Sequence, residues 1–74
     1  MKKKFKLEEL DCANCAAKME AAIRKIPGVR EANISFMAQK LTLEADDDRF
    51  EAILDEAQRA VTKIDRGCVI VRGA

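Results

Sequence analysis

Hydrophobic and polar residues alternate along three stretches of this chain and recur at steps of three and four along two others. Alternation with a period of two predicts strands buried on one face, and steps of three and four predict amphipathic helices. A short apolar run near the end predicts a last strand. The predicted strands are 3–9, 29–36, 40–45 and 68–72, and the predicted helices are 13–26 and a segment that opens at 46–48 and ends at 64.

The same pattern predicts which side chains form the core. The inward positions of the strands are Phe5, Leu7, Ala32, Ile34, Phe36, Leu41 and Leu43. Those of the helices are Ala16, Met19, Ala22, Ile23, Ile26, Phe50, Ile53, Leu54, Ala57, Val61 and Ile64. Pro27 and Gly28 end the first helix, because the residue before proline avoids the helical region and glycine accepts a left-handed exit.

Three consecutive aspartates, Asp46 to Asp48, precede the second helix. Asp48 followed by Glu51 resembles a capping box, and acidic residues in a first turn suit the helix dipole. A calcium loop is the alternative, but the glycine and the twelfth-position glutamate of an EF-hand are missing. We therefore interpret the aspartates as helix-capping residues.

The order of elements is strand, helix, strand, strand, helix, strand. With right-handed crossovers, this order predicts an α+β, ferredoxin-like βαββαβ sandwich, in which two helices cover one face of a four-stranded antiparallel sheet. We expect residues 1–74 to form a single domain. In this fold the loop after the first strand and the loop before the last strand lie at the same end of the sheet, which would bring Cys68 near Cys12 and Cys15.

Composition excludes several classes of function. The chain has 74 residues, a formal charge of +1 and 36% charged residues. So small a core leaves no room for a deep catalytic pocket, and the short basic cluster has too few aromatic neighbours to indicate nucleic-acid binding. We interpret that cluster as a solvated edge of the first strand, with a docking or membrane-surface role as the alternative. Its residues are Lys2, Lys3, Lys4 and Lys6.

Neither a transmembrane run nor a signal peptide is evident, so we expect a cytoplasmic protein that is monomeric. The chain has three cysteines and no histidine. An odd number of cysteines fits a reducing compartment. The absence of histidine excludes Cys₂His₂ zinc fingers and most histidine-based acid–base catalysis, and three thiols cannot close a Cys₄ site within one chain.

The stretch Leu10-Asp11-Cys12-Ala13-Asn14-Cys15-Ala16 holds the chemistry. Two cysteines three residues apart, where a predicted strand meets a predicted helix, can turn both sulfurs toward one point. Such a pair is a metal site or a dithiol redox centre, and the adjacent Asp11 carboxylate favours metal. We expect the helix dipole to favour the thiolate of Cys15, with Cys12 in the preceding flexible loop.

Each of three other residues has two possible roles. Asp11 is either a third metal ligand or a cap of the first helix or its preceding turn. Cys68 is either an additional ligand or a small buried residue. Met19, one turn past Cys15, is read as core filler, with a thioether ligand as the alternative.

The chain resembles the heavy-metal-associated domain family, which includes copper chaperones, mercuric-ion-binding proteins and amino-terminal domains of metal-exporting P-type ATPases. The resemblance lies in Leu10–Ala16, in Ile26-Pro27-Gly28-Val29, in Ala32-Asn33-Ile34-Ser35-Phe36 and in Val61-Thr62-Lys63-Ile64-Asp65. Copper-binding members usually carry methionine and threonine where this chain has Leu10 and Asp11. The zinc/cadmium/lead pump domains are therefore the most similar group.

The resemblance implies a domain without catalytic activity of its own, which binds Zn²⁺ or Cd²⁺, with Pb²⁺ also possible, and passes the ion on. It also implies the membrane and catalytic domains of a parent pump as partners. The charge of the site is an independent reason to expect a divalent ion. With two thiolates and a carboxylate, the loaded site has a net charge of −1 with a divalent ion but −2 with Cu⁺, and the larger charge is unfavourable in a partly desolvated site. A free-standing Cu⁺ metallochaperone and a dithiol redox module are the alternatives.

Overall fold

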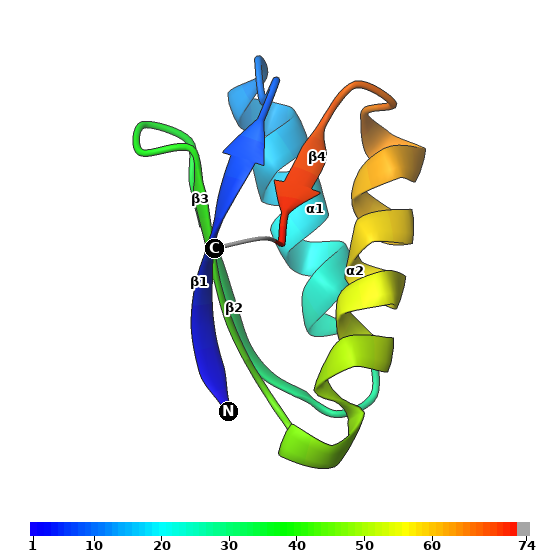
Figure 1. Cartoon of the computed structure of the whole chain (residues 1–74). Coiled ribbons are helices and arrows are strands. Elements are labelled where there is room, and N and C mark those ends of the chain that lie inside the picture. The colour runs from blue at the N-terminus through cyan, green and yellow to red at the C-terminus, as the bar shows by residue number, and fades with distance from the viewer. Residues whose placement is uncertain (73–74) are drawn as a thin grey trace.

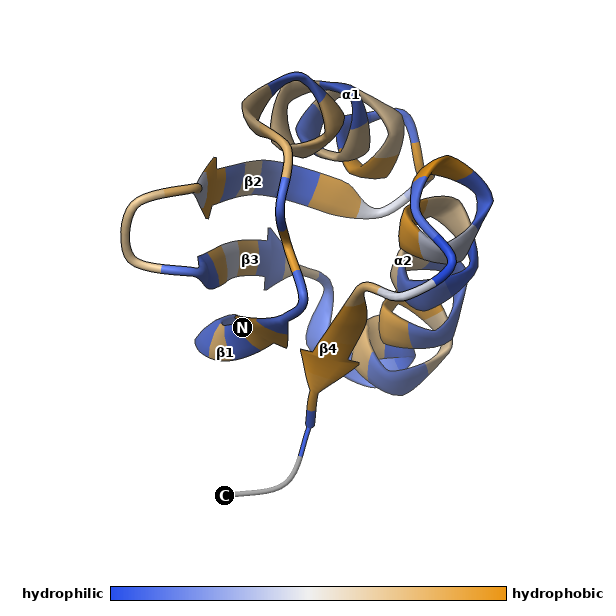
Figure 2. Cartoon of the chain, turned by 90° about the horizontal axis from the view of Figure 1, so that it is seen from above, coloured by the Kyte–Doolittle hydropathy of each residue, from blue (hydrophilic) through white to orange (hydrophobic). Residues whose placement is uncertain are grey.

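The computed structural model describes residues 1–72. In chain order the elements are β1 (Lys2–Glu8), α1 (Ala13–Arg24), β2 (Val29–Ser35), β3 (Lys40–Ala45), the 3₁₀ turn η1 (Asp47–Arg49), α2 (Phe50–Ile64) and β4 (Val69–Val71). The strands form one antiparallel sheet in the order β2-β3-β1-β4. Both helices cover the same face of this sheet (Figures 1 and 2). The predicted ferredoxin-like fold is confirmed.

The core lies between the sheet and the two helices, and it contains most of the predicted residues. Leu7, Leu41 and Leu43 from the sheet are at most 1% exposed, and Phe5 of β1 stacks on Phe50 of α2 with ring centroids 6.2 Å apart. Four predicted core residues are only half-buried: Ala22, Ile26, Ile34 and Ile64. Phe36 is exposed, because β2 ends at Ser35 and residue 36 belongs to the turn.

The end of α1 follows from Pro27 and Gly28, as predicted, although the helix stops two residues earlier than expected. Ile26 donates its N–H to the Ile23 carbonyl over 3.1 Å. This bond spans three residues, as in a 3₁₀ turn at the end of a helix. Gly28 has φ +95°, and a Cβ there would lie 2.8 Å from Cδ1 of Ile53. Both the positive φ and this close approach favour glycine at this position.

The predicted capping box at the start of α2 is wrong. Residues 47–49 form a 3₁₀ turn before the helix, so that Arg49 occupies the N-cap position. Neither Asp46 nor Arg49 makes a side-chain capping hydrogen bond. The aspartates still place negative charge before the helix N-terminus, where the dipole favours it.

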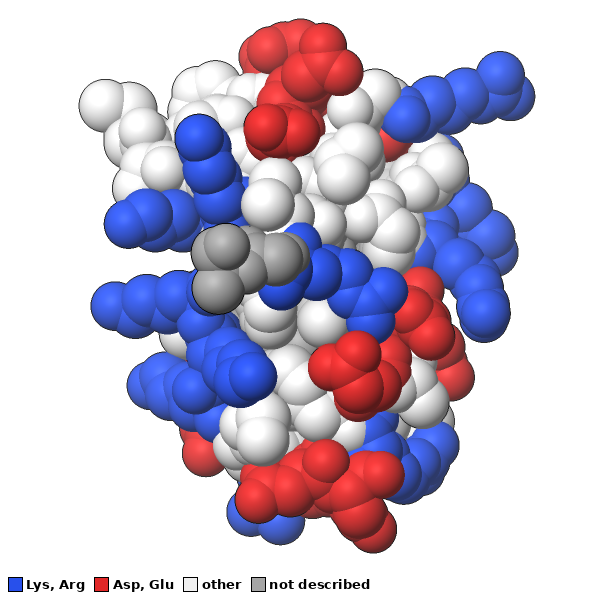
Figure 3. All heavy atoms as spheres, in the orientation of Figure 1, with Lys and Arg blue, Asp and Glu red and all other residues white. Residues whose placement is uncertain are grey.

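The basic cluster lies on β1, and its lysines are exposed, as predicted. β1 pairs with β3 along Lys2–Lys6 but with β4 only along Lys6–Glu8, so the first part of the strand has a paired neighbour on one side only. Lys2 forms an ion pair with Glu31 over 3.4 Å. Figure 3 shows lysine and arginine side chains gathered over the strands β1 and β3.

The last strand, β4, is shorter than the predicted 68–72 and lies at the edge of the sheet. The Cys68 N–H bonds to the Asp65 carbonyl over 3.2 Å, so Cys68 belongs to the preceding turn. Gln58 of α2 covers the free edge of β4: its Oε1 accepts from the Ile70 N–H at 2.8 Å, and its Nε2 donates to the Cys68 carbonyl at 3.4 Å. This side chain protects backbone groups that an exposed edge would leave open.

Three connections meet at the end of the sheet that is uppermost in Figure 1. They are the loop from β1 to α1, the loop from α2 to β4 and the turn between β2 and β3. Figure 2, which views this end from above, shows the first of them in front. The predicted proximity of the two loops that carry the cysteines is confirmed.

Candidate metal centre

The cysteine pair forms the N-terminus of α1. Cys12 is the N-cap residue, with φ −131° and ψ 121°, and its Sγ accepts a hydrogen bond from the Cys15 N–H at 3.3 Å. Its carbonyl accepts the first helical bond, from the Ala16 N–H at 3.0 Å. Both cysteines are half-buried and reduced. The sequence thus folds so that one sulfur replaces the usual capping oxygen and stays close to the other.

The two thiols differ in acidity, and in the opposite sense to the prediction from the helix dipole. A side-chain hydrogen bond with Cys15, followed by the bond from the Cys15 N–H, lowers the pKa of Cys12. The pKa of Cys15 is raised, first by the side-chain hydrogen bond with Cys12, and then by desolvation and by the Cys12 charge. The prediction was wrong because the capping residue, not the residue in the first turn, receives the hydrogen bonds that stabilise a thiolate.

These shifts predict the order of alkylation by iodoacetamide. Cys12 should react first and with a half-maximal rate at lower pH than an ordinary thiol, because a lowered pKa means more thiolate at a given pH. Cys15 should react at higher pH, and Cys68 should react only after unfolding. The measurement is peptide mass spectrometry over a pH series. In Cys12→Ser the Cys15 profile should move to lower pH, and first reaction at Cys15 in the unsubstituted protein would contradict the assignment.

Asp11 lies beside the pair with an exposed side chain. Its carboxylate has no hydrogen bond or ion pair to any other part of residues 1–72. Cys12 caps α1 in its place, so the alternative reading of Asp11 as the helix cap is wrong. The carboxylate is therefore available for a role in ligand binding.

Cys68 lies in the core, with 1% of its surface exposed. Burial raises the pKa of the Cys68 thiol, and the charges of Asp65, Asp11, Cys15 and Glu9 raise it further. The structure therefore brings Cys68 near the motif but holds it as a buried, protonated thiol. Met19 has no exposed surface and fills the core as expected.

Several carboxylates lie around Cys68, and the linear sequence did not indicate that they come together. A Cβ on Gly67 would lie 3.6 Å from Oε2 of Glu9 and 3.7 Å from Oδ1 of Asp65, and Asp65 accepts a hydrogen bond from the Gly67 N–H at 3.0 Å. Figure 3 shows acidic side chains grouped at the upper end of the molecule. These carboxylates favour the approach of cations to this end. Only the folded topology reveals them, because Glu9 and Asp65 are 56 positions apart in the sequence.

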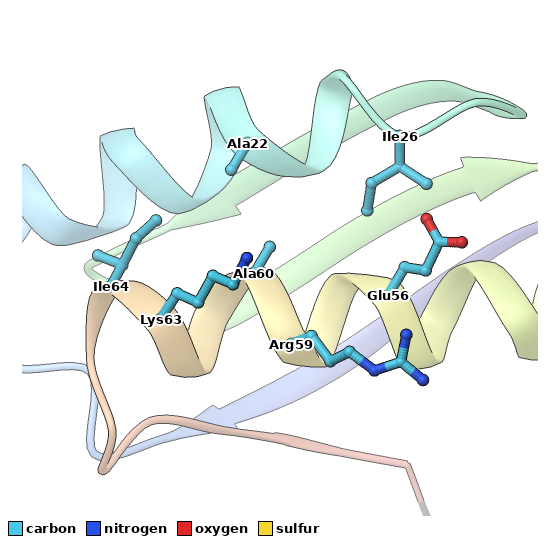
Figure 4. Close-up of a pocket in the computed structure, with 7 residues that line it drawn as sticks. All are labelled: Ala22, Ile26, Glu56, Arg59, Ala60, Lys63 and Ile64. Carbon is cyan, nitrogen blue, oxygen red and sulfur yellow. The ribbon is translucent and has the colours of Figure 1, made fainter.

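In residues 1–72, no group of three or more His, Cys, Asp or Glu side chains lies close enough together to hold a metal ion. The two thiols are thus a pair without a third group already in place. A groove of about 450 Å³ lies elsewhere, between α1 and α2 (Figure 4). Its apolar lining residues are Ala22, Ile26, Ala60 and Ile64, and no cysteine lines it. Within the described part of the chain, no helix is long and apolar enough to cross a membrane.

A βαββαβ sandwich with a Cys-x-x-Cys pair capping its first helix defines a small metal-binding module. Comparison with known families agrees, since the model of the heavy-metal-associated domain matches residues 4–66. The chain belongs to the heavy-metal-associated domain family.

Relatives of this chain include metal-transporting ATPases. The chain is 32% identical over 65 residues to the cadmium, zinc and cobalt-transporting ATPase of Bacillus subtilis (strain 168), covering 88% of this chain but 9% of that protein. Among solved structures, the N-terminal domain of ZntA in its Zn(II) form is 30% identical, with a TM-score of 0.69 and coverage of 93% of this chain and 86% of that one. The N-terminal domain of a potential copper-translocating P-type ATPase from Bacillus subtilis, in the Cu(I)-loaded state, is 28% identical, with a TM-score of 0.74 and coverage of 99% and 96%.

Proposed function

We propose that this domain binds Zn²⁺ or Cd²⁺ through Cys12 and Cys15, with Asp11 as a third ligand, and passes the ion to another protein segment by ligand exchange. The observation that carries the proposal is the half-buried cysteine pair at the N-terminus of α1, beside an exposed carboxylate that has no hydrogen bond or ion pair within residues 1–72. Thiolate and carboxylate together suit Zn²⁺ and Cd²⁺, whereas Cu⁺ favours soft sulfur ligands.

Charge supports a divalent ion. Two thiolates and the Asp11 carboxylate carry −3, so the loaded site has a charge of −1 with Zn²⁺ and −2 with Cu⁺. Glu9 and Asp65 add further negative charge nearby, which makes the excess in the Cu⁺ complex more unfavourable. Asp11 is therefore proposed to discriminate against the monovalent ion.

An incomplete ligand set suits transfer. Zinc prefers four ligands, and two thiolates with one carboxylate leave a coordination position that water or an incoming thiolate can take. Each bond from this domain is then broken as a bond to the acceptor forms. Because the thiols must lose their protons, binding releases protons and weakens as the pH falls.

The acceptor is proposed to be a heavy-metal efflux pump. The chain spans about a tenth of the length of the Bacillus subtilis ATPase, and several other relatives carry the names of zinc-, cadmium- or lead-transporting ATPases. We infer that the domain works on the cytosolic side of such a pump, with the pump's membrane and catalytic domains as its partners. Delivery of Cu⁺ is the second candidate, because copper transporters are among the relatives as well.

Competitive titration tests this proposal. We expect one Cd²⁺ per chain, with thiolate charge-transfer absorbance, and Zn²⁺ binding of the same stoichiometry. Asp11→Asn should weaken Zn²⁺ and Cd²⁺ binding by about 10- to 100-fold, the range for groups that support a metal site, and should leave Cu⁺ affinity within about twofold. If the unsubstituted protein binds Cu⁺ more tightly than Zn²⁺, and Asp11→Asn leaves the ratio of the two affinities unchanged, the copper alternative is favoured. Catalysed disulfide reduction without metal binding would favour the redox alternative.

A further inference from the structure

Gln39 connects the turn between β2 and β3 to the loop that carries the cysteine motif. Its Nε2 donates one hydrogen bond to the Leu10 carbonyl at 2.8 Å and one to the Phe36 carbonyl at 2.9 Å. The backbone carbonyl of Gln39 accepts a hydrogen bond from the Leu7 N–H at 2.8 Å. A carboxamide has two N–H donors, and both are used here, one in each connection.

The motif loop is held on both sides of Asp11. On one side, the Leu10 side chain is 3% exposed and packs in the core, while Gln39 holds its carbonyl. On the other side, the Cys12 sulfur is bound to the Cys15 N–H. Asp11 is the single residue between these two anchors, so they determine where its backbone lies.

The two anchors act on different ligands. Cys15 lies within α1, and Cys12 is fixed to it by the N-cap bond, so the spacing of the two sulfurs depends on the helix. Asp11 precedes the cap and has no partner of its own in residues 1–72. Its place relative to the sulfurs therefore depends on the Leu10 carbonyl and on the side chain that holds it.

We propose that Gln39 is a positioning residue that fixes the backbone before Asp11. The Asp11 carboxylate does not form a ready-made cluster with the two thiols in residues 1–72, and this fixed backbone lets it reach an ion bound by Cys12 and Cys15 by turning its side chain. This inference rests on the proposed role of Asp11 as a ligand. Zinc–oxygen bonds span only about 2.0–2.2 Å, so a small displacement of the loop removes the carboxylate from the ion. Cu⁺ held by the two sulfurs does not depend on this anchor.

The test compares Gln39→Met, which keeps the length of the side chain but has no donor, with Gln39→Asn. Asparagine retains the donors but is one methylene shorter, and it tolerates the left-handed conformation of residue 39, whose φ is +54°. Both variants should lower Zn²⁺ and Cd²⁺ affinity about tenfold, within the range for residues that support a metal ligand, and leave Cu⁺ affinity within about twofold. In an Asp11→Asn background, neither substitution should reduce divalent affinity further.

Gln58→Met is the matched control. It removes the same kind of amide-to-backbone bonds, at β4 instead of the motif loop, and should leave the ratio of Zn²⁺ to Cu⁺ affinity unchanged. Circular dichroism checks that each variant is folded. If Gln39→Met does not fold, Gln39→Asn alone tests the proposal.

Equal losses of Zn²⁺ and Cu⁺ affinity, additive effects with Asp11→Asn, or unchanged Zn²⁺ affinity in both Gln39 variants would overturn the positioning role. Failure of the proposed function is a separate result. It appears as absent binding in the unsubstituted protein, or as an Asp11→Asn variant that binds like the unsubstituted protein.

Discussion

Cys12→Ser should reduce Zn²⁺ and Cd²⁺ affinity by about 100- to 1,000-fold. This is the loss expected when one ligand is removed, if the binding free energy of a zinc site is divided equally among its four ligands. Serine can still cap α1, because its hydroxyl oxygen accepts the Cys15 N–H as well as the sulfur does. The helix is therefore preserved while the low-pKa thiolate is lost. Competition with a chromophoric chelator at pH 7.5 measures the change, and circular dichroism should show an unchanged fold.

Cys68→Ala is the control for this experiment. It removes the third thiol, which is buried and has a raised pKa, so divalent affinity should stay within about twofold even if the domain becomes less stable. Comparable losses in Cys68→Ala and Cys12→Ser would show that the buried thiol is a ligand after all. Full affinity in Cys12→Ser would remove the proposed site.

Phe50→Ala should destabilise the domain by about 3–5 kcal/mol, the usual effect of truncating a core phenylalanine. Phe50 is 3% exposed and stacks on Phe5 at 6.2 Å, joining α2 to the central strand β1. A domain of 74 residues has a total free energy of unfolding of about 4–11 kcal/mol. The substitution thus removes a large part of that stability, and urea denaturation followed by circular dichroism should show a much lower midpoint.

Phe36→Ala is the matched control for Phe50→Ala. Phe36 lies in the turn after β2 with 36% of its surface exposed, so the change should stay within about 0.5 kcal/mol, as for most surface substitutions. A loss at Phe36 as large as that at Phe50 would mean that the turn packs against the core more tightly than its exposure indicates.

The order of elements could be predicted from the sequence because each helix and strand has a clear apolar period and clear ends at residues such as Pro27 and Gly28. Phe36 was assigned wrongly because alternation continues past the last paired residue of β2, and periodicity does not show where pairing stops. The capping box failed for a related reason: Asp48 and Glu51 have the right spacing, but a 3₁₀ turn takes up the residues between β3 and α2.

The cysteine pair and Asp11 stand out in the sequence, whereas their surroundings do not. The relative acidity of Cys12 and Cys15 depends on which of them caps the helix, and this is decided by a backbone conformation that the motif letters do not specify. Gln39 lies 29 positions after Leu10 in a turn of ordinary composition. Its contact exists only because β3 returns beside β1.

The sulfur of Cys12 accepts the Cys15 N–H and is also a ligand in the proposed site. A thiolate has enough lone pairs for both contacts, but a bound cation withdraws electron density from the sulfur and so weakens the hydrogen bond that caps α1. In the proposed site, the first turn of α1 therefore differs in strength between the loaded and the empty domain.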